Sequence, residues 1–185
     1  MLVGASSLFY YTGPFGGKMP ALRSYWLYIH VSLAALGETF FAIAFVASLI
    51  YLYKAVTSPR APTAVESGAS ARPGLDAPDA LDALDALAYR AITIGFPLFT
   101  AGALVAGAIW AKQAWGAYWS WDPKEVLSLV VWLVYAAYLH ARLVRDLRGT
   151  PAAAISVAGF LLTLFTIFST LVFGGLHAYG LPGRG

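Results

Sequence analysis

The chain contains no cysteine, which excludes disulfides, thiolate chemistry and every metal site that needs a cysteine ligand. A prosthetic group attached covalently through a C-x-x-C-H motif is excluded for the same reason. Charge is also scarce, because 11% of the 185 residues are charged, against about 25% in soluble domains. The net charge of +3 is spread along the chain and therefore indicates no nucleic-acid-binding surface.

Hydrophobic residues, in contrast, make up 59% of the chain and gather into long runs. A helix of about 20 apolar residues crosses a hydrocarbon core of roughly 30 Å. Four runs approach this length, at 25–53, 91–111, 125–143 and 152–175. They predict an all-α, polytopic membrane protein with about four transmembrane helices. The second run contains Gly95, Gly102 and Gly107, which favour close helix packing, and Pro97, which is expected to kink it.

The segments between the runs indicate how the chain is oriented. Segment 54–90 is rich in Pro, Ala, Ser and Asp, and its aspartates recur every three residues from Asp76 to Asp85. A period of three drifts around a helix, so this segment is predicted to be a solvated, low-complexity loop, whose end could be weakly helical. Arginines follow the third run closely, and the positive-inside rule therefore places 54–90 and 144–151 in the cytoplasm. Segments 1–24, 112–124 and 176–185 are then predicted to lie outside.

The predicted outer loop is unusually aromatic. It reads Trp115-Gly116-Ala117-Tyr118-Trp119-Ser120-Trp121-Asp122-Pro123-Lys124-Glu125. Asp122, Pro123 and Glu125 form a helix-start pattern with a capping box, whatever the function of the loop. Capping does not explain the tryptophans. An interfacial belt would place tryptophans at both membrane boundaries, and here none lies at the inner one.

The chain has three histidines, and two of them are predicted to lie on the side of this loop. His30 is near the outer end of the first run, and His177 follows the fourth. Neutral imidazoles in a pair can ligate haem iron from both faces. The alternative is that each imidazole hydrogen-bonds to lipid headgroups or to the backbone. Lys112 and Lys124 could neutralise haem propionates, or they could be ordinary interfacial cations.

His140 and Glu38 are predicted to lie deeper in the membrane. His140 is about 22 Å along a helix from Glu125, too far to share one iron with the outer pair. As a haem ligand it would need a second ligand from another subunit; otherwise it extends to the inner interface beside Arg142. Glu38 lies two turns from His30, where it could pair with a basic group, accept a hydrogen bond from a ligand or face a polar interior.

The aromatic stretch from Trp115 to Glu125 resembles the tryptophan-rich "WWD" signature of the haem-handling proteins of cytochrome c biogenesis. The likeness is greatest to the CcsA (ResC-like) group of System II, and CcmC and CcmF are more distant. Further likeness lies in the segments Pro20-Ala21-Leu22-x-Ser24-Tyr25-Trp26-Leu27-x-Ile29-His30-Val31, Trp132-Leu133-Val134-Tyr135-Ala136-x-Tyr138-Leu139-His140-x-Arg142 and Gly175-Leu176-His177-x-Tyr179. Typical members have further spans before the first of these segments, so the chain is expected to be short at its amino-terminal end.

The resemblance implies a function. Haem b would be a cargo that is presented at the outer face for covalent attachment to apocytochrome c, in a cytochrome c synthase (haem lyase) complex. It assigns His30 and His177 as axial ligands of an outer haem, and His140 as ligand of a membrane haem whose second ligand comes from a CcsB (ResB-like) partner. The remaining signature residues would form the haem platform: Trp115, Gly116, Tyr118, Trp119, Trp121, Asp122, Pro123, Lys124 and Glu125. The membrane would be a bacterial plasma membrane or a thylakoid.

Two other functions stay open on the sequence. One is a haem-bearing anchor, or electron-transfer subunit, of a respiratory complex, which would hold fixed haems and need no apocytochrome. Such anchors pair histidines between spans, and His140 has no such partner in the chain. The other is a membrane scaffold without haem, whose tryptophans serve the interface.

Overall fold

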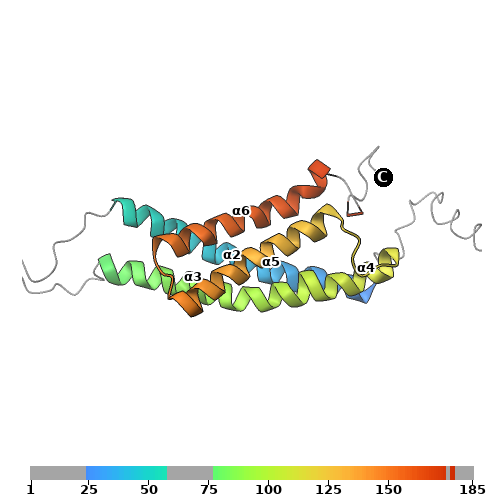
Figure 1. Cartoon of the computed structure of the whole chain (residues 1–185), viewed down its shortest axis with the longest axis horizontal. Helices are drawn as coiled ribbons and strands as arrows, with labels where there is room; N and C mark the ends of the chain where they lie inside the picture. Colours follow the sequence, from blue (N-terminus) through green and yellow to red (C-terminus); the bar gives the residue numbers. More distant parts are fainter. Residues whose placement is uncertain (1–23, 58–76, 174–175, 178–185) are drawn as a thin grey trace, which may run out of the picture.

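The computed structural model describes residues 24–57, 77–173 and 176–177, which form a helical bundle without strands (Figure 1). In chain order the helices are α2 (Tyr25–Thr57), α3 (Ala77–Phe99), the π-helix η2 (Thr100–Ala106), α4 (Gly107–Trp115), α5 (Pro123–Arg145) and α6 (Thr150–Phe173). Helices α3, η2 and α4 follow one another without a break. Four continuous helices therefore make up the described bundle, and each is long and apolar enough to cross a membrane. The predicted all-α, multi-pass membrane fold is confirmed.

The helices run lengthwise along an elongated bundle, so the described residues have two distinct ends (Figure 1). We call one the loop end; it holds the start of α2, the end of α4, the start of α5 and the end of α6. We call the other the arginine end; it holds the end of α2, the start of α3 and the connection from α5 to α6. The aromatic loop lies at the loop end, together with residues 176–177.

The bundle exposes apolar side chains along its length. Val46, Leu133 and Leu161 are each more than half exposed although they lie in the middle of long helices. Water would make such a surface costly, whereas lipid chains solvate it well. The exposed apolar faces and the helix lengths therefore agree that the chain is a multi-pass membrane protein.

Aromatic rings and glycines hold the middle of the bundle together. The Phe41 ring stacks on Tyr135, with centroids 3.7 Å apart, and also contacts Phe99, with centroids 5.5 Å apart. Helices α2 and α3 approach closely because Gly37 and Gly95 have no side chain; a Cβ at Gly37 would lie 2.6 Å from the Phe99 nitrogen. This packing agrees with the prediction that the glycine-rich run lies within a bundle.

The π-helix η2 begins three residues after Pro97, where a kink is predicted. Proline cannot donate a backbone hydrogen bond to the preceding turn, and this weakens the α-helical ladder at that point. Thr100 Oγ1 donates to Phe96 O at 2.7 Å and accepts from Trp132 Nε1 at 2.9 Å, which ties this region to α5. The sequence pattern predicts a span over 91–111 with a kink at Pro97, but it does not predict that a π-helix follows.

At the arginine end, the predicted loop over 54–90 is too long. Helix α2 continues to Thr57, and α3 begins at Ala77, inside the aspartate repeat. The spans accordingly extend beyond their predicted bounds: 91–111 is part of Ala80–Trp115, 125–143 is part of Pro123–Arg145, and the fourth begins at Thr150. The structure does not describe residues 1–23, 58–76 (which include Asp76), 174–175 and 178–185.

A buried ion pair explains why the repeat is helical. Asp85 lies 2.8 Å from Arg142, and both side chains are almost fully buried. Asp85 also accepts a hydrogen bond from the Gly149 nitrogen at 3.1 Å, and Arg142 stacks over the Tyr89 ring. From the period of three, all the aspartates were expected to be solvated alike. In the structure Asp85 faces the bundle, whereas Asp82 is exposed.

Candidate functional site

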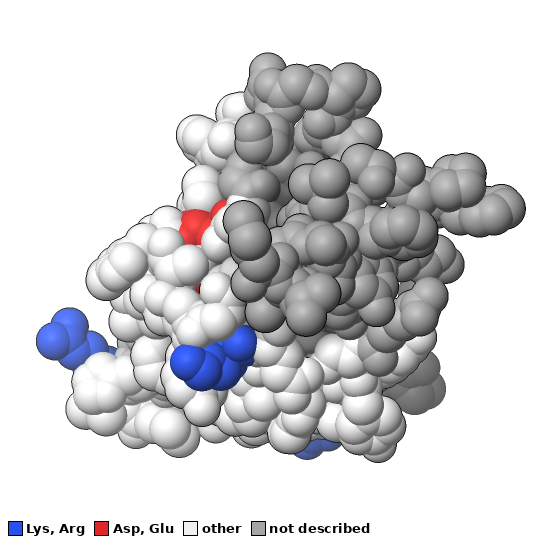
Figure 2. Space-filling model, turned by 90° about the vertical axis from the view of Figure 1, so that its right-hand side faces the viewer, with Lys and Arg blue, Asp and Glu red and all other residues white. Residues whose placement is uncertain are grey.

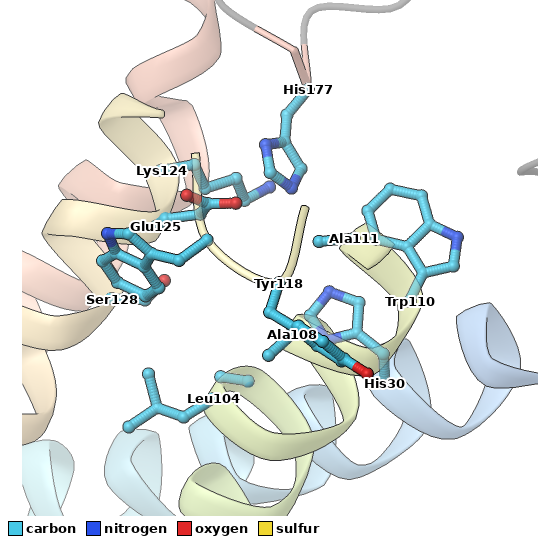
Figure 3. Close-up of a pocket in the computed structure, with 13 residues that line it drawn as sticks. His30, Leu104, Ala108, Trp110, Ala111, Tyr118, Lys124, Glu125, Ser128 and His177 are labelled. Atoms are coloured by element: carbon cyan, nitrogen blue, oxygen red, sulfur yellow. The ribbon is translucent and has the colours of Figure 1, made fainter. Parts of the chain in front are cut away.

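A pocket of about 450 Å³, including its open mouth, lies at the loop end. Helix α2 contributes His30, the η2–α4 region contributes Trp110, and the aromatic loop contributes Tyr118 and Trp119. The start of α5 and the residues after α6 complete the lining with Lys124, Glu125 and His177 (Figure 3). Segments separated by almost 150 residues thus meet here.

His30 is held with one ring nitrogen directed at a backbone carbonyl. Its Nδ1 lies 2.9 Å from the carbonyl oxygen of Gly102. A carbonyl only accepts, so Nδ1 carries the proton and donates it, which leaves Nε2 of the neutral ring with a free lone pair. The ring also stacks on Trp110, with centroids 5.8 Å apart and planes inclined by 7°.

The π-helix provides the carbonyl that holds His30. Gly107 N–H donates to Gly102 O five residues back, the spacing that defines a π-turn. Gly102 lies directly against the α2 backbone at Leu33 and Ala34, where a Cβ would overlap backbone atoms. A Cβ at Gly107 would lie 3.1 Å from the His30 ring. Gly102 therefore allows η2 to lie directly against α2, and Gly107 leaves room for the imidazole of His30.

His177 is held in the same way, but by a charged group. Its Nδ1 lies 2.9 Å from Oδ1 of Asp122, so Nδ1–H donates to the carboxylate and Nε2 is again left unprotonated. The ring packs against Trp115 and Trp110, with centroids 5.1 and 5.8 Å away. Burial lowers the pKa of His177 below its ordinary value of 6.5, which outweighs the raising effect of the Asp122 hydrogen bond. The imidazole is therefore neutral at neutral pH, the state that binds metal.

The backbone of the aromatic loop is fixed at both of its ends. Gly116 ends α4 with a φ of +85°, in the left-handed region that glycine tolerates. Asp122 then caps α5, and the capping box with Glu125 that the sequence predicts is confirmed. The Glu125 carboxylate also accepts from Ser120 N–H at 2.8 Å. Between these bonds Trp121 is held at a φ of +59°, a strained conformation for a bulky residue.

The structure brings together only some of the predicted haem-platform residues. Tyr118, Trp119, Lys124 and Glu125 line the pocket with both outer histidines. Trp115 and Asp122 contact the His177 ring but do not line the pocket. Gly116 ends α4, and Pro123 is the first residue of α5. Trp121 is 74% exposed and does not line the pocket.

Trp110 is a site residue that the sequence pattern does not single out. It is buried, and its ring contacts His30, His177 and Trp115. In the sequence it looks like an interfacial tryptophan at the end of an apolar run. Its position five residues before the signature was the one available signal, and that signal is weak.

His140 and Glu38 do not belong to this pocket. His140 lies 17 residues along α5 from Pro123, about 26 Å away, and its side chain is exposed on the outside of the bundle. Glu38 is half-buried on α2 and forms no ion pair with any residue in the described ranges.

Charged residues are few on the described surface of the loop end. Figure 2 views the described surface from the loop end, where separate basic groups and a small acidic area lie in a mostly uncharged surface. Lys112 donates to Gly116 O at 2.8 Å and lies over the Tyr118 ring, so it serves the loop itself. Lys124 is the basic group that lines the pocket.

The donor set suits a flat metal complex better than a bare ion. Two imidazoles reach one pocket, each with Nδ1 engaged and Nε2 unprotonated, and aromatic rings form its walls. Among residues 24–57, 77–173 and 176–177, no group of three or more His, Asp or Glu could enclose a metal ion. Haem needs only two axial ligands, because the porphyrin supplies the other four.

Comparison with known proteins identifies the family of the chain. The family profile described as "Cytochrome C assembly protein" matches residues 1–177. The chain belongs to this family. Relatives named "Cytochrome c biogenesis protein CcsA" include those of Synechococcus sp. (strain RCC307), Chlamydomonas reinhardtii and Guillardia theta, which are 42%, 39% and 39% identical. Each alignment covers 88% of this chain, and 56%, 42% and 56% of the respective relatives. The chain thus spans about half the length of these cytochrome c assembly proteins.

Proposed function

We propose that the protein binds haem in the loop-end pocket and presents it, outside the membrane, for covalent attachment to the C-x-x-C-H motif of apocytochrome c. The observation that carries this proposal is the pair His30 and His177. Both imidazoles line one pocket, and hydrogen bonds to Nδ1 leave Nε2 of each free for iron. Membership of the cytochrome c assembly family supports the proposal and does not favour the respiratory-anchor alternative.

Each group in the pocket has a role that its chemistry suggests. His30 and His177 would be the axial ligands of the haem. Trp119 and Trp110 would provide the apolar aromatic surface that a porphyrin needs, and Lys124 would neutralise a propionate. Haem supplies the vinyl groups to which the cysteine thiols of apocytochrome c add. The protein would therefore contribute orientation and exclusion of water, as part of a cytochrome c synthase complex.

His140 fits a second site, shared with another protein. Its imidazole is exposed on an outward face of α5 that also presents Leu133, Ala137 and Val144. Because burying an unpaired polar group in lipid is costly, such a residue is a functional candidate. We propose that it ligates a haem within the membrane, with the second ligand from a CcsB (ResB-like) partner. Haem b would pass from there to the outer pocket.

The membrane in question is a bacterial plasma membrane or a thylakoid. The named relatives come from cyanobacteria and from photosynthetic eukaryotes, which agrees with either. Arg142, Arg145 and Arg148 gather at the arginine end, so we place that end in the cytoplasm or stroma. The pocket then faces the periplasm or the thylakoid lumen.

The double substitution His30→Ala and His177→Ala tests the proposed function. We expect the purified protein to lose the Soret band of its outer haem, and cells to lose holocytochrome c, because both axial ligands are gone. Asp146→Ala, an exposed change at the arginine end, is the control and should leave both measurements at wild-type level. Unchanged haem content together with unchanged cytochrome c maturation in the double variant would contradict the proposal.

A further inference from the structure

Asp122 has more partners than a helix cap requires. Its Oδ1 accepts hydrogen bonds from the backbone N–H of Lys124 at 3.0 Å and from His177 Nδ1 at 2.9 Å. Its Oδ2 accepts one from the backbone N–H of Leu176 at 2.6 Å. The side chain is only 1% exposed. The first bond is the cap itself. The other two come from a segment more than 50 residues further along the chain, after α6.

Capping alone does not explain an aspartate at this position. Serine, threonine and asparagine cap helices about as well as aspartate and carry no charge to bury. A buried carboxylate is favourable only where several donors compensate for its lost hydration. Here Leu176 and His177 provide those donors, so the aspartate is matched to the residues after α6 as well as to α5.

We propose that Asp122 is a positioning residue of the pocket that acts on a metal ligand through His177. The carboxylate fixes the ring orientation and keeps the proton on Nδ1, so that Nε2 is presented to the pocket. It also makes the imidazole a stronger electron donor, as carboxylate–histidine pairs do in other metal sites. This inference rests on the proposed haem-binding function and assigns Asp122 a role behind the ligand instead of in contact with haem.

The same geometry makes the two histidines unequal. His30 donates to the neutral carbonyl of Gly102, whereas His177 donates to a carboxylate. A charged acceptor draws the Nδ1 proton more strongly and leaves more electron density on Nε2. His177 is therefore the stronger donor of the pair, and it stabilises ferric iron more than His30 does.

The test measures the reduction potential of the bound haem in the full-length Asp122→Asn variant. Asparagine keeps the size and one acceptor oxygen of aspartate but removes the charge. We expect a low-spin haem spectrum to remain, the reduction potential to rise, and haem affinity to fall by about 10- to 100-fold. A purely structural role would lower the thermal stability of the protein without moving the potential of the haem that remains bound.

The Asp122→Ser variant keeps the helix cap but removes the contact with His177. It replaces the asparagine variant in the test if that variant does not accumulate. Serine caps α5 but is too short to hold His177, so we expect a folded protein with the same rise in potential. Asp146→Asn, at the far end of α5, is the matched carboxylate control and should leave the potential unchanged. An unchanged potential and affinity in both Asp122 variants would overturn the inference.

The result is distinguishable from a failure of the proposed function. If the inference alone is wrong, His177→Ala still loses outer haem while the Asp122 variants match wild type. If haem binding at this pocket is wrong, His177→Ala itself leaves the haem spectrum unchanged. In that second case a loss of stability in the Asp122 variants would report only the link between the loop and α6.

Discussion

The position and orientation of the His30 ring depend on a few backbone atoms of η2 and α4. The imidazole fits because Gly107 lacks a Cβ, and η2 lies against α2 because Gly102 lacks one. The ring is oriented because the π-turn leaves the Gly102 carbonyl oxygen in reach of Nδ1. These conditions depend on a few residues of η2 and on the first residue of α4. A methyl group added there should therefore affect both the stability of the bundle and the orientation of His30, the proposed ligand.

Gly102→Ala tests this dependence. The added methyl group would overlap the α2 backbone at Ala34, so η2 and α2 must separate. We expect an overpacking cost of about 1–3 kcal/mol in the free energy of unfolding, and a lower haem content because His30 loses its acceptor. Unfolding by SDS titration and the Soret absorbance per protein measure the two effects.

Val105→Ala is the matched control, because Val105 lies on the same π-helix but is more than half exposed to the surroundings of the bundle. It should leave haem content unchanged. Wild-type stability and haem content in Gly102→Ala would show that α2 and η2 are not packed as described.

Some of these residue-level features could be predicted from sequence and others could not. The Asp122–Glu125 capping box is a local pattern, and it is confirmed. Span order alone placed His30 and His177 at one end, and the structure does bring them to one pocket; their role as ligands stays a prediction. The contacts of Trp110 and the Asp122–His177 bond were missed, because they depend on how helices remote in sequence pack together.

At the scale of helices, too, some features could be predicted from the sequence and others could not. Apolar length predicted the four spans, since lipid requires backbone hydrogen bonds to close within a helix. The start of α3 was missed because an aspartate repeat looks solvated until one of its members finds a buried arginine. The π-helix was missed because Pro97 predicts a disturbance in the helix but not its form.

Asp85→Ala tests the role of the buried ion pair. Removing one partner leaves Arg142 almost fully buried without its carboxylate, so we expect a loss of about 3–5 kcal/mol in the free energy of unfolding. SDS titration in detergent measures it. Asp82→Ala makes the same chemical change at an exposed position of the same helix and repeat, and should cost little.

Equal stabilities of the Asp85 and Asp82 variants would show that the ion pair does not hold the start of α3 in place. A large loss in the Asp85 variant would explain how a helix begins in a segment whose composition favours a loop.

At the scale of the whole molecule, the absence of cysteine makes the orientation easy to measure. Tyr118→Cys places one thiol in the aromatic loop, and Asp146→Cys places one at the opposite end; both positions are exposed. We expect a membrane-impermeant maleimide to label the first variant in intact cells. It should label the second only after the membrane is opened, because the arginines favour the cytoplasmic side.

The unmodified chain is the control for labelling of other proteins. Labelling of Asp146→Cys but not Tyr118→Cys in intact cells would reverse the orientation, and with it the side on which the proposed function needs apocytochrome c.

The helices differ markedly in length. Helix α2 and the continuous helix Ala80–Trp115 have 33 and 36 residues, whereas α5 and α6 have 23 and 24. At 1.5 Å per residue the first pair spans about 50 and 54 Å and the second about 35 and 36 Å. A thinner bilayer tilts long helices more than short ones. His30 lies on a long helix and His177 follows a short one, so bilayer thickness should change the relative placement of the two proposed haem ligands.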